Sequence, residues 1–212
     1  MNLIFIEAKN ANTSECNFLK AVLSKHFADK SVEFICMNGV GNLFQKSIIN
    51  RMEQAQVEGD SVLVLVDADS PSKGWGYTKR HDDIEDKKTQ LQLNFPLFIY
   101  PNNNDDGDVE VLMESLICKD LHKDWWDCFE DYETCIQGAK DSENNQKYNL
   151  PNRKAKLHTY ITSQQLNKKQ RDKIGSGFWL FDDPNYWDLT RETLKPLLDF
   201  FDAYLKLSLI HI

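Results

Sequence analysis

Short apolar runs and amphipathic segments alternate along the first half of the chain. Four runs are apolar almost throughout and rich in β-branched or aromatic residues, as expected of strands that are covered on both faces. These predicted strands are residues 2–6, 32–37, 61–66 and 95–100. The predicted helices are residues 15–28, 43–55, 80–93 and 109–117; the third is strongly polar, and the others carry apolar residues at helical spacing.

Strands and helices follow one another in strict order over residues 1–117. This order predicts an α/β domain with a mostly parallel, four-stranded, Rossmann-like sheet flanked by helices. Beyond Ile117 the pattern changes to helical segments around residues 122–139, 155–174 and 190–207. Most tryptophans fall in this second part, namely Trp125, Trp126, Trp179 and Trp187. We expect them to close a mainly helical extension, residues 118–212, against the sheet.

Acidic residues follow two of the predicted strands directly. Glu7 comes after the first strand, and Asp67 and Asp69 come after the third. Ligands of open parallel sheets bind beyond the carboxyl ends of the strands. Carboxylates gathered at one such edge repel one another, and a hard cation such as Mg²⁺ or Mn²⁺ offsets that repulsion. The pattern predicts a divalent-cation site; the alternative is that each acid caps the helix that follows it, which we would favour for a single aspartate.

The arrangement resembles the Toprim domain of topoisomerases, primases and the overcoming-lysogenization-defect nucleases. The resemblance is carried by the apolar strand that ends in Glu7, the pair Phe18-Leu19 in the next helix, and VLVLVDAD at residues 62–69. It covers residues 1–117 and implies a Toprim-like fold in which the glutamate and the Asp-x-Asp form the metal site. Ala8 stands where that family usually has glycine.

Later segments resemble small stand-alone bacterial Toprim-like proteins of unknown function. These segments are FIYPNNNDDGDVEVLMESL, KAKLHTY and PLLDFF. The resemblance implies further ligands, since Glu15 stands in the same relation to Phe18-Leu19 as an aspartate of the nuclease branch, and Glu110 follows Asp-Asp-Gly. Glu15 could instead complement a helix dipole, and Glu110 could lie with Glu114 on a solvated helix face. Candidate phosphate ligands are Lys154 and Lys156 by resemblance, and Lys73 and Lys79 by position.

These features predict a divalent-metal-dependent nuclease or related phosphoryl-transfer enzyme. Glu7 would bind the metal or act as general base, and Asp67 and Asp69 would hold one or two cations that activate water. The alternative is a non-catalytic Toprim-like module, recruited by a partner such as an ATPase into a larger assembly, for example in phage defence. A receiver domain would need a lysine after a later strand, where FPLFIYPNN has none, and a glycosyltransferase would normally need more chain for its acceptor.

Charge and composition narrow the range of functions and locations that the sequence allows. The net charge of -8 disfavours a broad, sequence-independent grip on nucleic acid, so phosphate contacts should be local. The five cysteines lack the close pairs of zinc or disulfide frameworks, and the five histidines lack HExxH spacing. The N-terminal apolar run is too short for a signal peptide, and no stretch reaches the ~20 apolar residues of a membrane span. We therefore expect a cytoplasmic protein that does not bind membranes.

Overall fold

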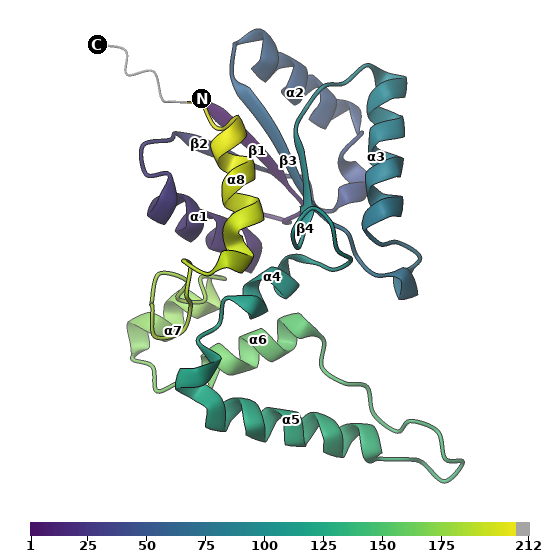
Figure 1. Ribbon diagram of the computed structural model, residues 1–212, viewed down its shortest axis with the longest axis vertical. Coiled ribbons are helices and arrows are strands. Elements are labelled where there is room, and N and C mark those ends of the chain that lie inside the picture. Colours follow the sequence, from purple (N-terminus) through teal and green to yellow (C-terminus); the bar gives the residue numbers. More distant parts are fainter. Residues whose placement is uncertain (207–212) are drawn as a thin grey trace.

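The computed structural model describes residues 1–206, which contain one parallel four-stranded sheet (Figure 1). The strands are β1 (Asn2–Ile6), β2 (Val32–Cys36), β3 (Ser61–Asp67) and β4 (Leu97–Tyr100), in the order β2-β1-β3-β4. Each neighbouring pair is parallel, and Ile6 lies opposite both Cys36 and Leu65. The predicted α/β fold is confirmed.

Helices cover both faces of this sheet (Figure 1). On one face α1 (Ser14–His26) and α8 (Lys195–Tyr204) pack against β-strand residues such as Ile4 and Leu63. On the other face α2 (Lys46–Val57) and α3 (Tyr77–Leu91) pack against their neighbours Leu3 and Val62. Successive strand side chains point to opposite faces, so burial on both faces requires the continuous apolar runs seen in the sequence.

The remaining helices gather beyond the carboxyl ends of the strands (Figure 1). They are α4 (Val109–Ser115), α5 (Lys123–Gly138), α6 (Arg153–Thr162) and α7 (Lys168–Gly175). Short 3-10 turns occur at Val40–Asn42, Pro71–Lys73, Lys119–His122 and Glu192–Leu194. The helical character of the C-terminal portion is confirmed, and position 207 of the last predicted helix lies outside the described residues. This placement brings the helical portion to the edge where the predicted acids lie.

The predicted helical segment 155–174 is divided into α6 and α7. Asn167 begins the second helix with a capping box, in which its side chain accepts from Gln170 N–H and the Gln170 side chain accepts from Asn167 N–H. Similarly, α2 begins at Lys46 rather than at Leu43, because residues 43–45 continue as a turn after the 3-10 turn Val40–Asn42. These differences come from capping and turn chemistry, not from the apolar pattern.

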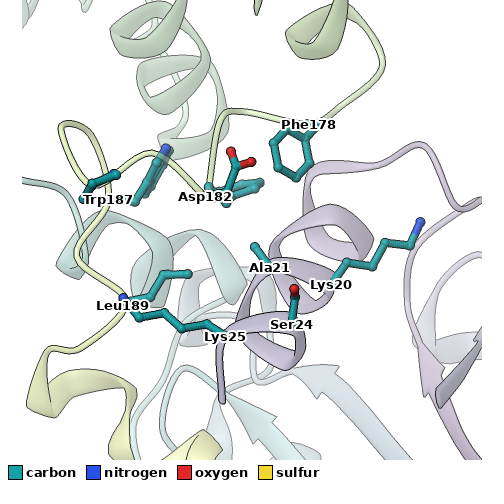
Figure 2. A pocket seen from close by; sticks show the side chains of 10 residues that line it. Lys20, Ala21, Ser24, Lys25, Phe178, Asp182, Trp187 and Leu189 are labelled. Atoms are coloured by element: carbon teal, nitrogen blue, oxygen red, sulfur yellow. The ribbon is translucent and has the colours of Figure 1, made fainter. Parts of the chain in front are cut away.

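The segment between α7 and α8 runs back to α1, and a cavity of about 530 Å³ lies between them (Figure 2). Phe178, Asp182 and Trp187 lie on one side of it, opposite Ala21 and Ser24 of α1. Its lining is mostly apolar, and it contains none of the residues that the sequence predicts for the metal or phosphate site. The candidate chemistry therefore lies elsewhere.

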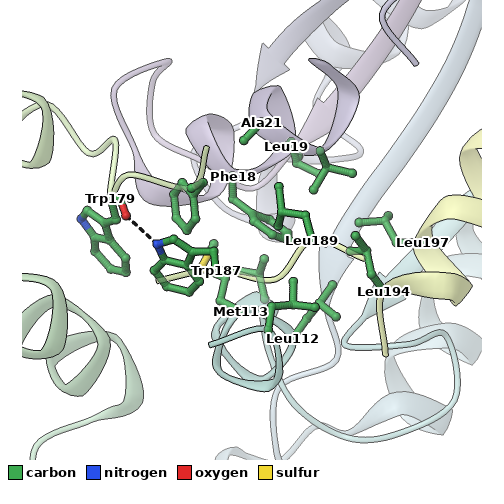
Figure 3. Close-up of a cluster of buried hydrophobic side chains, with 14 of the residues drawn as sticks. Phe18, Leu19, Ala21, Leu112, Met113, Trp179, Trp187, Leu189, Leu194 and Leu197 are labelled. Atoms are coloured by element: carbon green, nitrogen blue, oxygen red, sulfur yellow. Dashed lines mark hydrogen bonds between the residues drawn. The ribbon is translucent and has the colours of Figure 1, made fainter. Parts of the chain in front are cut away.

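The helical portion shares a hydrophobic core with the sheet. Trp187 is buried in it, and its indole N–H donates a hydrogen bond of 2.7 Å to the carbonyl of Trp179 (Figure 3). The same cluster contains Phe18 of α1 and Met113 of α4. These two residues precede the predicted boundary, whereas both tryptophans follow it. The division into an α/β domain, residues 1–117, and a helical extension packed on it, residues 118–212, stays a prediction. Within residues 1–206, no helix has the length and apolar character needed to cross a membrane.

Candidate acidic site at the carboxyl edge of the sheet

Glu7 follows β1 and is fixed by backbone groups from two other segments. Its Oε1 accepts a hydrogen bond of 2.8 Å from Asp67 N–H, and its Oε2 accepts one of 3.1 Å from Val40 N–H. Burial raises the pKa of the Glu7 carboxyl above its usual value, although these bonds and the Arg80 guanidinium act in the opposite direction. The Glu7 carboxylate thus has one defined orientation and an unfavourable environment for its charge.

Asp67 ends β3, next to Glu7 at the same edge. Its Oδ1 accepts a hydrogen bond of 2.9 Å from the N–H of Val109, the first residue of α4. Burial raises the pKa of Asp67 well above its usual value, and the charges of Glu7, Glu15 and Glu110 raise it further. Hydrogen bonds thus join Asp67 to Glu7, through the Asp67 N–H, and to Val109, the residue before Glu110.

Two helix N-termini bring the remaining acids to this edge. Thr13 caps α1 and places Glu15 in its first turn, while Asp108 caps α4 and places Glu110 in its first turn. Both glutamates are only 7% exposed. Burial, followed by the charges of Glu7 and Glu110, raises the pKa of Glu15 to about 8. We call Glu7, Glu15, Asp67 and Glu110 the acidic cluster.

Tyr100, the last residue of β4, lies beside the acidic cluster. It is fully buried, and its hydroxyl has no hydrogen-bond partner among residues 1–206. Burial raises the pKa of this phenol, and the carboxylates of the acidic cluster add to the effect. Sequence reasoning missed Tyr100, although its place at the end of the fourth predicted strand was an available signal. An unpaired buried hydroxyl is costly, because it has lost its hydrogen bonds to water without gaining others.

Asp69 points to basic side chains. Its backbone has a φ of +61°, and its carboxylate accepts hydrogen bonds of 2.8 Å from Arg80 and 2.9 Å from Lys73. Arg80 is buried, stacks at 3.9 Å on the Trp75 ring, and donates from Nε to the carbonyl of Asp67. Sequence reasoning missed Arg80 because a buried arginine in a polar helix leaves no distinctive pattern. It ties the loop after β3 to the acidic edge.

The candidate phosphate ligands fall in different places. Lys154 lies 3.0 Å from Glu110 and therefore reaches the acidic cluster. Lys73 forms an ion pair with Asp69 and, within residues 1–206, with no other predicted metal ligand. Lys156 pairs with Glu133 at 2.8 Å, and Lys79 donates to the carbonyl of Gly74. The structure thus brings one of the four lysines into contact with the cluster itself.

Among residues 1–206, no three His, Cys, Asp or Glu side chains are arranged so that they could hold a metal ion as they stand. Glu7 and Asp67 instead accept from backbone N–H groups, and Glu110 pairs with Lys154. The donor chemistry still fits Mg²⁺ or Mn²⁺, since all four groups are carboxylates and Tyr100 adds an unpaired hydroxyl. The cluster thus offers the oxygen donors that a hard cation prefers.

The fold and site define a parallel α/β protein with an acidic cluster at the carboxyl edge of its sheet, an arrangement compatible with a Toprim-like fold. Residues 1–206 match the family described as "Protein of unknown function (DUF3226)", and the chain belongs to that family. No curated protein and no solved structure matches the chain.

Proposed function

We propose that the acidic cluster binds Mg²⁺ or Mn²⁺ and that the protein is a metal-dependent nuclease or a related phosphoryl-transfer enzyme. The observation that carries the proposal is the meeting of Glu7, Glu15, Asp67 and Glu110 from four separate elements, with raised pKa values for three of them. Burying like charges together destabilises a fold, and a hard cation relieves that cost. Perturbed titration in such a group is typical of functional sites.

The proposed roles follow from position. A bound cation would polarise the scissile phosphate and lower the pKa of a bound water. Glu7 is held by two backbone N–H groups, which suits it to keep one orientation as ligand or general base. Asp67, Glu15 and Glu110 supply the other carboxylates. Asp69 remains a proposed ligand, and its contacts with Arg80 and Lys73 would then be exchanged for the cation.

The basic residues at this edge suit an anionic substrate. Lys154 already touches Glu110 and is the best placed of the lysines to meet a phosphate, while Lys73 lies beside Asp69. Lys156 has the least support, because its ammonium group pairs with Glu133. With a net charge of -8, such contacts to nucleic acid would be local.

A non-catalytic Toprim-like module is the second candidate. It is favoured by the Lys154 ammonium, which lies 3.0 Å from Glu110 and offsets the charge of one carboxylate without a metal. In this case the acidic edge would recognise a partner, such as an ATPase in a larger assembly, rather than a scissile phosphate.

Thermal unfolding with Mn²⁺ tests the proposal. At about one hundred times Kd, a cation that binds only the folded state stabilises it by about 2.7 kcal/mol, which is a Tm rise of roughly 5–10 °C. Asp67→Asn should abolish the rise, and Asp199→Asn, which removes an exposed carboxylate, should keep it. Cleavage of single-stranded, double-stranded and nicked DNA should require Mn²⁺ and be lost in Asp67→Asn. Equal shifts in all three proteins would contradict the metal site; a specific shift without cleavage would favour the binding module.

A further inference from the structure

One turn beyond Glu110, α4 carries Glu114, and three basic side chains from other elements surround it. They are Lys119 of the following 3-10 turn, Arg153 at the start of α6, and Arg191 before the next 3-10 turn. Together with Val111 and Ser115, these residues line a cavity of about 380 Å³. We call Lys119, Arg153 and Arg191 the basic pocket.

Glu114 holds two of these cations in place. Its Oε1 accepts from Lys119 at 3.1 Å, and its Oε2 accepts from Arg153 Nε at 2.8 Å. Partial burial alone would raise the pKa of Glu114, but these hydrogen bonds lower it below its usual value. Arg191 is fixed separately, by donating to the carbonyl of Ser115 at 2.9 Å. Arg191 also lies 3.6 Å from Asp188, and Arg153 lies 3.7 Å from Asp108, so each of the three cations has a carboxylate neighbour that a more strongly bound anion would have to replace.

The basic pocket remains accessible to a ligand. The side chains of Lys119, Arg153 and Arg191 are 45%, 40% and 34% exposed. A guanidinium has five N–H donors, and Arg153 uses Nε for Glu114 while its Nη1 lies 3.7 Å from Asp108, beyond hydrogen-bond distance. Within residues 1–206 its planar fork therefore has donors to spare for a bidentate acceptor such as phosphate.

The basic pocket and the acidic cluster are neighbours. Glu110 and Glu114 are four residues apart on α4, which places their Cβ atoms about 5–6 Å apart. The residue after Arg153 is Lys154, whose ammonium lies 3.0 Å from Glu110. A ligand with one phosphate at each site would therefore need phosphates about one helical turn apart, as consecutive phosphates of a strand are.

We propose that the basic pocket binds a phosphate of a nucleic-acid strand adjacent to the phosphate at the acidic cluster. This inference rests on the proposed function and names its substrate class as a polynucleotide. A mononucleotide monophosphate can fill one of the two positions but cannot bridge them. In a chain with a net charge of -8, three partly exposed cations gathered around one cavity supply the strand contact that the rest of the surface disfavours. Glu114 acts as the anion that orders the cations when no strand is bound.

Fluorescence anisotropy with a labelled oligothymidylate of about twelve nucleotides tests this proposal in metal-free buffer. Arg153→Ala and Lys119→Ala should each weaken binding about fivefold or more and reduce the salt dependence by about 0.7 in log-log slope. Glu114→Gln should tighten binding, because it removes the competing charge. Lys87→Ala, which removes an exposed lysine paired with Asp83 on α3, should leave binding unchanged. Thymidine monophosphate should compete at least about tenfold less well than unlabelled oligonucleotide.

The outcomes separate this inference from the proposed function. Arg153→Ala should retain the Mn²⁺-induced rise in Tm, since it leaves all four acids in place. Normal binding by Arg153→Ala and Lys119→Ala, equal binding by Glu114→Gln, or equal competition by thymidine monophosphate would overturn the basic pocket while the metal site stands. If Arg153→Ala does not fold, Lys119→Ala and Glu114→Gln decide the matter.

Discussion

The Glu7 carboxylate accepts a hydrogen bond of 2.8 Å from the backbone N–H of Asp67, 60 residues further along the chain. This bond joins the ends of the two central strands of the sheet. Two backbone N–H groups favour the charged form of Glu7, yet its pKa is still raised, so burial dominates. The acidic edge thus holds electrostatic strain that a mutation, a proton or a cation can relieve.

Asp67→Asn should leave the metal-free protein as stable as the wild type or slightly more stable. The substitution removes one of the clustered charges, and the amide oxygen can still accept from Val109 N–H. Urea unfolding in the presence of a chelator measures this. If Asp67 acts only as a structural cap, losing its charge should instead cost about 1 kcal/mol.

The stability of the metal-free protein should fall as pH rises from about 4.5 to about 8. Over this window Glu15 keeps its proton when folded, because its pKa is about 8, but loses it when unfolded. The unfolded state then binds fewer protons, so the free energy of unfolding decreases with pH, by at most about 1.4 kcal/mol per unit for this group. The charges that act on Glu15 are those of Glu7, Glu110 and Lys154, together with that of Asp67.

Glu15→Gln should flatten this pH dependence, and saturating Mn²⁺ should flatten it in the wild type. Urea unfolding at a series of pH values makes the comparison, with Glu143→Gln as the control because Glu143 is exposed. A slope that persists unchanged in Glu15→Gln would assign the pH dependence to other groups.

The fold could be predicted from sequence because its strands are buried on both faces. The runs VLVLV and NLIFI are apolar throughout, which predicts strands buried on both faces. The strict alternation of such strands with helices then implies parallel pairing. The boundary between α6 and α7 was missed because it depends on one capping box at Asn167, not on the apolar pattern. Local hydrogen bonds of this kind are invisible to periodicity.

The site was only partly predictable for a related reason. Glu7 and Asp67 stand out because they end apolar strands, and Glu15 and Glu110 were candidates through resemblance and their place at helix starts. Arg80 could not be found, since the polar helix around it hides which side chain turns inward. The pairing of Lys156 with Glu133 depends on how α6 packs on α5, which sequence spacing does not determine.

Arg80→Ala should destabilise the protein by about 2–3 kcal/mol. This value is below the full cost of breaking a buried ion pair, because Asp69 is partly exposed. The change leaves the Asp69 carboxylate with Lys73 alone and removes the donor to the carbonyl of Asp67. Urea unfolding measures the loss. Arg51→Ala is the matched control, because its pair with Glu33 is more exposed and should contribute less than about 1 kcal/mol. Equal effects of the two substitutions would argue against a special role for Arg80.

Gly177→Ala should destabilise the protein by more than about 1 kcal/mol, because at this glycine the segment after α7 approaches the turn before α1 closely. Gly177 has a φ of +81°, and an added Cβ would lie 2.5 Å from the carbonyl oxygen of Asn12. Asn12 precedes the Thr13 cap that sets the first turn of α1, where Glu15 lies. Relieving the clash would therefore displace the cap, and we expect a smaller Mn²⁺-induced rise in Tm as well as a lower Tm.

Gly175→Ala provides the control for this last effect. Its added Cβ meets no atom within 4 Å, and it ends α7 without a positive φ, so the substitution should be neutral or stabilising by up to about 1 kcal/mol. Thermal unfolding of both variants, with and without Mn²⁺, makes the comparison. If Gly177→Ala lowers the Tm but leaves the Mn²⁺ response intact, the contact at Asn12 supports the fold and does not position Glu15. If the two variants behave alike, the close approach at Asn12 contributes nothing measurable.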